Sequence, residues 1–164
     1  MVNLMKKILF LLLLLFIFPL SVFSYDFNIN SNNVILINLN EDKILYEKNS
    51  DSKTYIASLT KIMTAVVVLE NIDDLSTKVL LTTEDFKDIY KYDLQTSGLR
   101  VNNYYTYEEL LYALLLPSGA DAASCIARNI GGSVSNFVKM MNDKAKELNL
   151  NNTKFANPIG YDDI

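Results

Sequence analysis

The chain has 164 residues, of which half are hydrophobic and 21% are charged, a composition that suits one globular domain with a hydrophobic core. The net charge of −4 leaves no basic surface and argues against nucleic acid as a partner. The absence of histidine excludes a Ser-His-Asp triad, a Cys-His pair and a His-based zinc site within this chain. A nucleophile must therefore be activated by Lys, Tyr or a carboxylate, and we expect no metal and no cofactor.

The N-terminus has the pattern of an export signal. Two lysines precede an apolar run from Ile8 to Leu20, and the segment Ser21–Ser24 follows with small residues at the −3-like and −1-like places. Cleavage after Ser24 would divide the chain into a signal peptide (1–24) and an exported domain (25–164). The alternative is an uncleaved membrane anchor, but the run is interrupted and falls short of roughly 18 to 20 apolar residues.

The exported part begins with a predicted hairpin. Val34–Leu39 is an apolar run that predicts a buried strand, and Lys43–Lys48 predicts a second, half-buried strand. Asn40–Asp42 supplies turn residues between the two strands. The polar segment Asn49–Lys53 predicts a surface loop.

A predominantly helical region follows. The pattern from Ser58 to Leu69 predicts a helix with almost no solvated face, although the β-branched stretch Val66–Leu69 is also compatible with a strand. The single cysteine, Cys125, lies among small and apolar residues and is expected to be a buried packing residue. The remaining predicted elements are a short strand at Lys78–Leu81 and helices at Glu84–Lys91, Thr106–Leu116 (capped by Thr106), Ala120–Ile130 and from Ser133, with Val134, Phe137, Val138, Met141, Ala145 and Leu148 on one face.

Ser58 and Lys61 are the first candidates for chemistry. They stand three residues apart at the start of a helix, so both side chains project from one face. A serine hydroxyl needs a base to take its proton, and a desolvated lysine can be that base. The plainer alternative is an N-cap serine followed by a surface lysine. A second match to the same spacing, Ser50 and Lys53, lies in a polar loop where nothing would desolvate the lysine.

Ser118 is the third candidate. It lies in the turn between two predicted helices, a position that suits the presentation of a hydroxyl to a cleft. Its alternative interpretation is an N-cap for the next helix, and Asp121 is equally explained as an acidic residue in the first helical turn.

Several segments, taken in order, resemble the low-molecular-mass D-alanyl-D-alanine carboxypeptidases, which are penicillin-binding serine hydrolases. The segments that carry the resemblance are Glu41–Asn49, Ala57–Ala65, Glu108–Gly119, Phe137–Asn142 and Thr153–Pro158. The resemblance implies an α/β fold of the β-lactamase and transpeptidase kind, with the predicted hairpin as the first part of the sheet and the helical region beside it.

The resemblance also implies the roles of the candidate residues. Ser58 would form the acyl-enzyme, Lys61 would be its general base, and Ser118 would relay a proton or orient Lys61. The substrate would be a peptidoglycan pentapeptide ending in D-Ala-D-Ala, and β-lactams would acylate the same serine. The protein would act at the outer face of the cytoplasmic membrane, in the periplasm or in the cell wall, with membrane association through an uncleaved signal or a C-terminal anchor.

Two departures from the family pattern matter. The second family motif is Ser-x-Asn, but its third position here is Ala120, and the loss of one orienting amide corresponds to about 1 to 3 kcal/mol. The third motif, Lys-Thr-Gly, has no counterpart after Ser118. We therefore expect an N-terminal part of a catalytic domain, without the later sheet strands and with impaired activity.

Two other functions remain open. A β-lactamase would share the nucleophile and the fold, and would need a carboxylate that holds the deacylating water, for which Asp162 and Asp163 are the acidic candidates near the end. The other alternative is a non-catalytic fragment or pseudoenzyme of the cell envelope, which Ala120 and the missing third motif favour.

Overall fold

The computed structural model describes residues 29–161, which divide into two units: the described residues up to Ser52, and those from Lys53 onward. The predicted signal peptide (1–24) lies outside the described residues, as do Asp162 and Asp163. Among residues 29–161, no helix combines the length and the apolar character that a membrane span needs.

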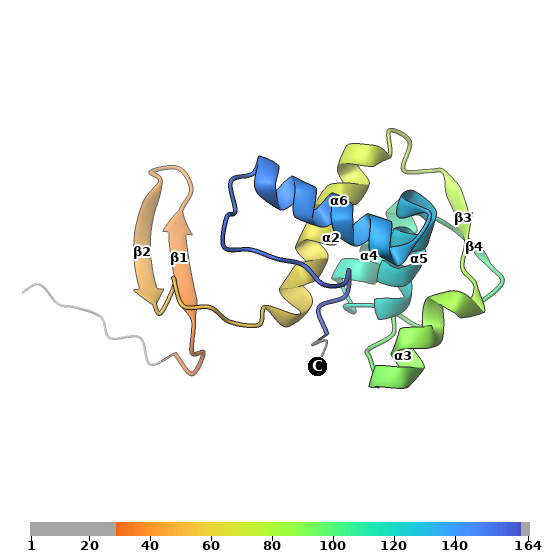
Figure 1. Cartoon of the computed structure of the whole chain (residues 1–164), viewed down its shortest axis with the longest axis horizontal. Helices are drawn as coiled ribbons and strands as arrows, with labels where there is room; N and C mark the ends of the chain where they lie inside the picture. Colours follow the sequence, from red (N-terminus) through yellow and green to blue (C-terminus); the bar gives the residue numbers. More distant parts are fainter. Residues whose placement is uncertain (1–28, 162–164) are drawn as a thin grey trace, which may run out of the picture. The chain divides into compact units, whose positions relative to one another are not determined.

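The first unit is the predicted hairpin (Figure 1). Strand β1 (Val34–Asn38) pairs antiparallel with β2 (Lys43–Lys48), and the register shifts between Leu36 and Ile37. The prediction that the first strand is buried is wrong, because Ile35 and Leu36 are 54% and 53% exposed. Between residues 29 and 52 the unit has two strands and no helix to cover them, so the apolar side chains of the hairpin stay in contact with solvent.

The second unit contains five helices longer than one turn, two 3-10 helices and a small sheet among its described residues. These elements are η1 (Ala57–Leu59), α2 (Thr60–Asn71), β3 (Lys78–Leu80), η2 (Thr83–Phe86), α3 (Lys87–Tyr92), β4 (Tyr104–Thr106), α4 (Tyr107–Leu115), α5 (Ala120–Gly131) and α6 (Val134–Glu147). The predicted helices are confirmed, and Val66–Leu69 is helical.

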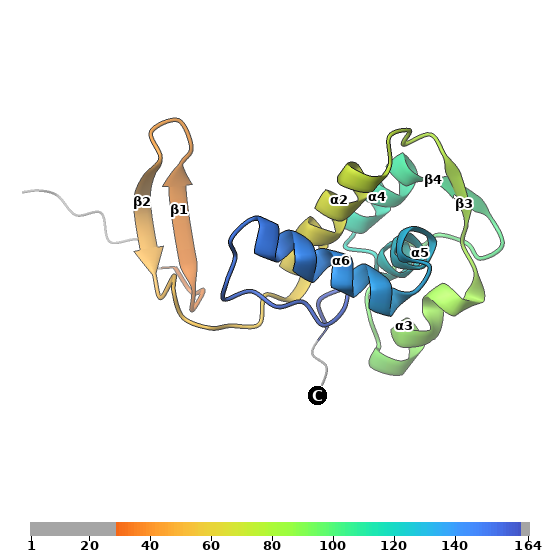
Figure 2. The same cartoon turned by 45° about the horizontal axis from the view of Figure 1, so that its top comes forward.

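Helix α5 is the centre of this unit (Figure 2). It packs against α2, α4, α6 and η2, and eight consecutive residues from Ala120 to Ala127 are buried. Small side chains dominate this run, which lets the neighbouring helices approach closely. Cys125 is 0% exposed, as predicted, and burial raises the pKa of its thiol to about 12. It is therefore a packing residue and not a reactive thiol.

The helix boundaries follow local chemistry. Thr106 caps α4, as predicted, and the structure adds a capping box: its hydroxyl accepts from the Glu109 N–H at 3.1 Å, while the Glu109 carboxylate accepts from the Thr106 N–H at 2.8 Å. Ser133 caps α6 by accepting from the Asn136 N–H at 3.2 Å. On α6 the predicted apolar face is buried at Phe137, Met141 and Ala145, but exposed at its two ends.

Strand β4 was not predicted from the sequence. It pairs antiparallel with β3, with Val79 opposite Tyr105, and joins the segments before η2 and before α4. Each strand has three residues, which is too short to show a periodic pattern, so the pairing becomes visible only in the tertiary structure.

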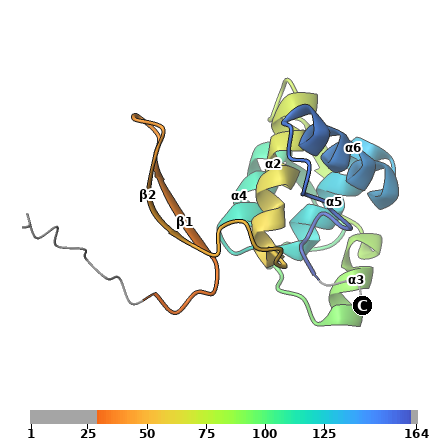
Figure 3. The same cartoon turned by 60° about the vertical axis from the view of Figure 1, so that its left-hand side comes forward.

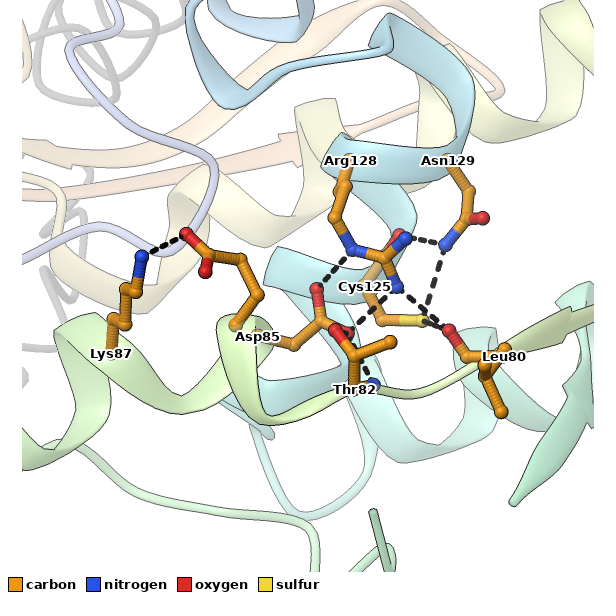
Figure 4. Close-up of polar contacts among 8 residues, drawn as sticks. Leu80, Thr82, Asp85, Lys87, Cys125, Arg128 and Asn129 are labelled. Atoms are coloured by element: carbon orange, nitrogen blue, oxygen red, sulfur yellow. Dashed lines mark hydrogen bonds and ion pairs between the residues drawn. The ribbon is translucent and has the colours of Figure 1, made fainter. Parts of the chain in front are cut away.

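An ion pair between a partly exposed arginine and a buried carboxylate ties the β3–η2 connection to α5 (Figure 4). The Arg128 guanidinium donates to both carboxylate oxygens of Asp85, at 2.8 and 2.9 Å, and to the Leu80 carbonyl at 2.7 Å. Asp85 also completes the capping box of η2, whose N-cap is Thr82, because its carboxylate accepts from the Thr82 N–H at 2.8 Å. The Asp85 side chain is 1% exposed, so Arg128 is the counter-charge that makes its burial tolerable.

Candidate active site

Ser58 lies in the short helix η1, immediately before α2. The residue before it, Ala57, has a φ of +46°, in the left-handed region that non-glycine residues seldom adopt. The N-cap positions of η1 and α2 are Ile56 and Leu59, and neither helix has a side-chain cap. The alternative interpretation of Ser58 as an N-cap serine is therefore wrong, and its exposed hydroxyl is available for chemistry.

The three sequence candidates come together. Lys61 Nζ lies 3.2 Å from Ser58 Oγ, and the Ser118 hydroxyl donates to Ser58 Oγ at 3.0 Å across 60 residues of sequence. Ser58 Oγ thus has an amine on one side and a second hydroxyl on the other. This is the arrangement that a serine nucleophile needs when no histidine is present.

Lys61 is buried, with 3% of its surface exposed. Desolvation lowers its pKa below the usual 10.5, which favours the neutral amine that can accept a proton. Its nitrogen also donates to the backbone carbonyl of Ile159 at 2.9 Å. This bond orients the amine without adding a negative charge, which would raise its pKa again.

The loop that supplies this carbonyl runs beside the start of α2 (Figure 3). Asn157 Oδ1 accepts from the N–H groups of Ile159 and Gly160 at 3.1 and 2.7 Å, so the buried Asn157 shapes the turn. Thr64 of α2 donates to the Pro158 carbonyl at 2.7 Å. Sequence reasoning missed these roles, although Thr153–Pro158 was one of the segments that carried the resemblance.

Gly160 brings this loop against the nucleophile segment. Its φ is +94°, and a Cβ built there would overlap the carbonyl oxygen of Ala57 and lie 2.9 Å from Thr60 Oγ1. Only glycine combines this conformation with so close an approach. The loop therefore sets the position of Ala57 and, through it, of Ser58.

Ser118 is placed by its own backbone. Its φ is +62°, and the N-cap of α5 is the next residue, Gly119, so Ser118 is not the cap of that helix. Asp121 has a larger role than an acidic residue in a first turn. It is fully buried and accepts from both the N–H and the hydroxyl of Ser97, at 2.9 and 2.8 Å, which ties the start of α5 to the preceding loop.

The second Ser-x-x-Lys match lacks these features. Ser50 donates to Glu47 at 3.2 Å on an exposed segment, and Lys53 is exposed. This lysine therefore lacks the burial that Lys61 has.

Two hollows flank Ser58, Lys61 and Ser118. A cavity of about 90 Å³ is also lined by Gln95, Ala120 and Tyr161. A wider groove of about 340 Å³, on the apolar side, is lined by Leu59, Ile62 and Leu115 among others. The Ser58 hydroxyl is thus accessible to a ligand, and no group of His, Cys, Asp or Glu side chains in the described part of the chain is placed to hold a metal ion.

Comparison with known proteins places this geometry in context. Residues 21–164 match the S11 peptidase family, described as D-alanyl-D-alanine carboxypeptidase. The D-alanyl-D-alanine carboxypeptidase DacF of Bacillus subtilis is 37% identical over 126 residues, which are 77% of this chain and 32% of DacF. The D-alanyl-D-alanine endopeptidase of Escherichia coli is 34% identical over 77% of this chain and 40% of its own length.

A solved structure confirms the expected fold class. The Streptomyces K15 DD-transpeptidase is 32% identical, with a TM-score of 0.79, over 84% of this chain and 55% of that chain. The chain thus spans only about a third of the length of DacF and about half of the solved transpeptidase.

Proposed function

Because the chain belongs to the S11 family of D-alanyl-D-alanine carboxypeptidases, we propose that its protein is a serine-type D-Ala-D-Ala carboxypeptidase that trims peptidoglycan pentapeptides. The observation that supports the proposal most strongly is the convergence on Ser58 Oγ of a buried amine at 3.2 Å and a second hydroxyl at 3.0 Å. Neither serine caps a helix, so a purely structural role does not explain the arrangement.

The proposed reaction uses each of these groups. The neutral Lys61 amine accepts the Ser58 proton as Oγ attacks the carbonyl carbon of the penultimate D-Ala. The peptide bond to the terminal D-Ala then breaks, and its nitrogen takes a proton delivered from Lys61 through Ser118. Water attacks the resulting ester, Lys61 removes its proton, and the tetrapeptide leaves as Ser58 regains its hydrogen.

The proposal extends to ligands and to location. A β-lactam carries a strained amide that Ser58 would open in the same way, which would leave the enzyme acylated. The signal-like segment 1–24 supports export, with residues 25–164 at the outer face of the cytoplasmic membrane, in the periplasm or in the cell wall. An envelope location agrees with a peptidoglycan substrate.

Release of D-Ala from diacetyl-Lys-D-Ala-D-Ala tests the activity, with the protein produced from its full gene. We expect D-Ala release that disappears in Ser58→Ala, and no release of L-Ala from the matched peptide that ends in D-Ala-L-Ala. Hydrolysis that persists in Ser58→Ala, or an absence of hydrolysis by the purified, folded parent, would contradict the proposal.

A further inference from the structure

The residues that line the small cavity beside Ser58 differ in the hydrogen-bonding groups that they can offer to a ligand. Ser58, Lys61 and Ser118 line it, but their polar atoms are already engaged with one another. At the start of α5 the wall is Ala120, which is 1% exposed and offers only a methyl group. A peptide that enters this cavity must still find partners for its own backbone N–H and C=O groups, because leaving them unpaired is unfavourable.

Gln95 is the lining residue that can supply such partners. Its backbone carbonyl accepts from the Ala120 N–H at 2.9 Å, which fixes Gln95 directly beside the start of α5. Its carboxamide forms no hydrogen bond with any residue in the described range 29–161. A carboxamide offers both donors and an acceptor, so it can pair with a peptide group in either sense.

The other polar lining group is already committed. The Tyr161 hydroxyl donates to Asp88 at 3.2 Å, and its ring stacks on Tyr92 with 4.6 Å between centroids. The neighbour of Gln95, Thr96, is exposed and does not line the cavity, which makes it a suitable control.

We infer that Gln95 is a substrate-binding residue whose carboxamide holds the amide carbonyl on the acyl side of the reacting bond, next to the methyl group of Ala120. This inference rests on the proposed function, because it concerns the same site and the same peptide substrate. Gln95, in the loop between α3 and β4, would thus bind the carbonyl that an amide side chain at position 120 would otherwise bind.

Two β-lactams separate this role from a structural one. Benzylpenicillin carries an acylamido carbonyl that Gln95 can bind, whereas 6-aminopenicillanic acid has the same reactive ring without that carbonyl. We expect Gln95→Met to slow acylation of the full-length protein by benzylpenicillin about tenfold, the effect of one lost hydrogen bond, and to leave acylation by 6-aminopenicillanic acid unchanged. Thr96→Ala should change neither rate.

A second variant makes the test independent of the first. Ala120→Asn in the Gln95→Met background should restore most of the benzylpenicillin rate, because a new amide then faces the same carbonyl. Equal slowing with both β-lactams, or no slowing with either, would overturn the inference while Ser58 acylation in the parent still supports the proposed function. A parent protein that neither β-lactam acylates would overturn both.

Discussion

Lys61 and Ile159, which are 98 residues apart in sequence, are joined by a hydrogen bond of 2.9 Å from the lysine nitrogen to the backbone carbonyl. The bond holds the amine beside Ser58 Oγ through an uncharged acceptor. A carboxylate in that place would stabilise the protonated lysine and would make it a poor base. The loop around Ile159 is therefore part of the candidate active site, although it carries none of the reacting atoms.

The rate of Ser58 acylation should rise with pH. Only the neutral Lys61 can accept the serine proton, and desolvation lowers its pKa. The pH at which the rate is half-maximal should therefore lie below 10.5.

The same lowered pKa of Lys61 predicts that the folded protein is less stable at low pH. The folded chain binds this proton more weakly than the unfolded chain, so stability should increase as pH rises from the folded pKa of Lys61 to 10.5.

Lys61→Arg tests the base directly. Arginine keeps its proton at every accessible pH, so acylation should fall by about 10² to 10⁴. The measurement is the rate of labelling by fluorescent penicillin across the pH range. The matched control is Lys154→Arg, which changes an exposed lysine and should retain the parent rate. A pH-independent rate, or a normal rate in Lys61→Arg, would show that another group is the base.

Gly160→Ala should damage both stability and acylation. The added methyl group would overlap the Ala57 carbonyl and would strain a φ of +94°, with a total loss of about 2 to 5 kcal/mol in the free energy of unfolding. Gly132→Ala is the control, because its φ is +70° but nothing lies within 4 Å of the new Cβ. It should lose only about 1 to 2 kcal/mol by urea denaturation and keep normal labelling. Equal losses in the two variants would mean that the Gly160–Ala57 approach is unimportant.

The Asp85–Arg128 pair should contribute to stability more than any surface pair. Arg128→Met leaves the buried Asp85 carboxylate without its counter-charge and should lower the free energy of unfolding by about 3 kcal/mol. Lys139→Met breaks the ion pair between Lys139 and Asp143, whose two side chains are 77% and 47% exposed. This variant should change the free energy of unfolding by less than about 0.5 kcal/mol. Urea denaturation measures both, and similar small effects would rule out a stabilising role for the buried pair.

Much of the helical unit could be predicted, because its signals are local. The side chains of Thr106 and Ser133 cap their helices by accepting from backbone N–H groups only three residues further along the chain. The turn at Pro117 and Gly119 separates α4 from α5. The three site residues were identified from spacing, helix context and family resemblance. The structure adds that all three groups meet within hydrogen-bond distance.

The missed features depend on contacts across long stretches of sequence. Every residue has a backbone carbonyl, so the role of the Ile159 carbonyl gives no signal in the sequence. Gln95 lies in a loop without a periodic pattern. The salt bridge of Asp85 to Arg128 spans 43 residues, and each partner alone resembles an ordinary surface charge. The apolar character of Val34–Leu39 predicts a buried strand. The prediction fails because sequence alone does not show how many strands or helices pack against that run.

The central claim, that Ser58 is the nucleophile, is tested most directly by covalent labelling with fluorescent penicillin. The comparison uses the full-length parent, Ser58→Ala and Ser50→Ala, the last of which changes the serine of the exposed second match. Peptide mapping of the labelled parent should place the adduct on Ser58, with labelling lost in Ser58→Ala and retained in Ser50→Ala. Labelling that survives in Ser58→Ala, or that disappears in Ser50→Ala, would contradict the account.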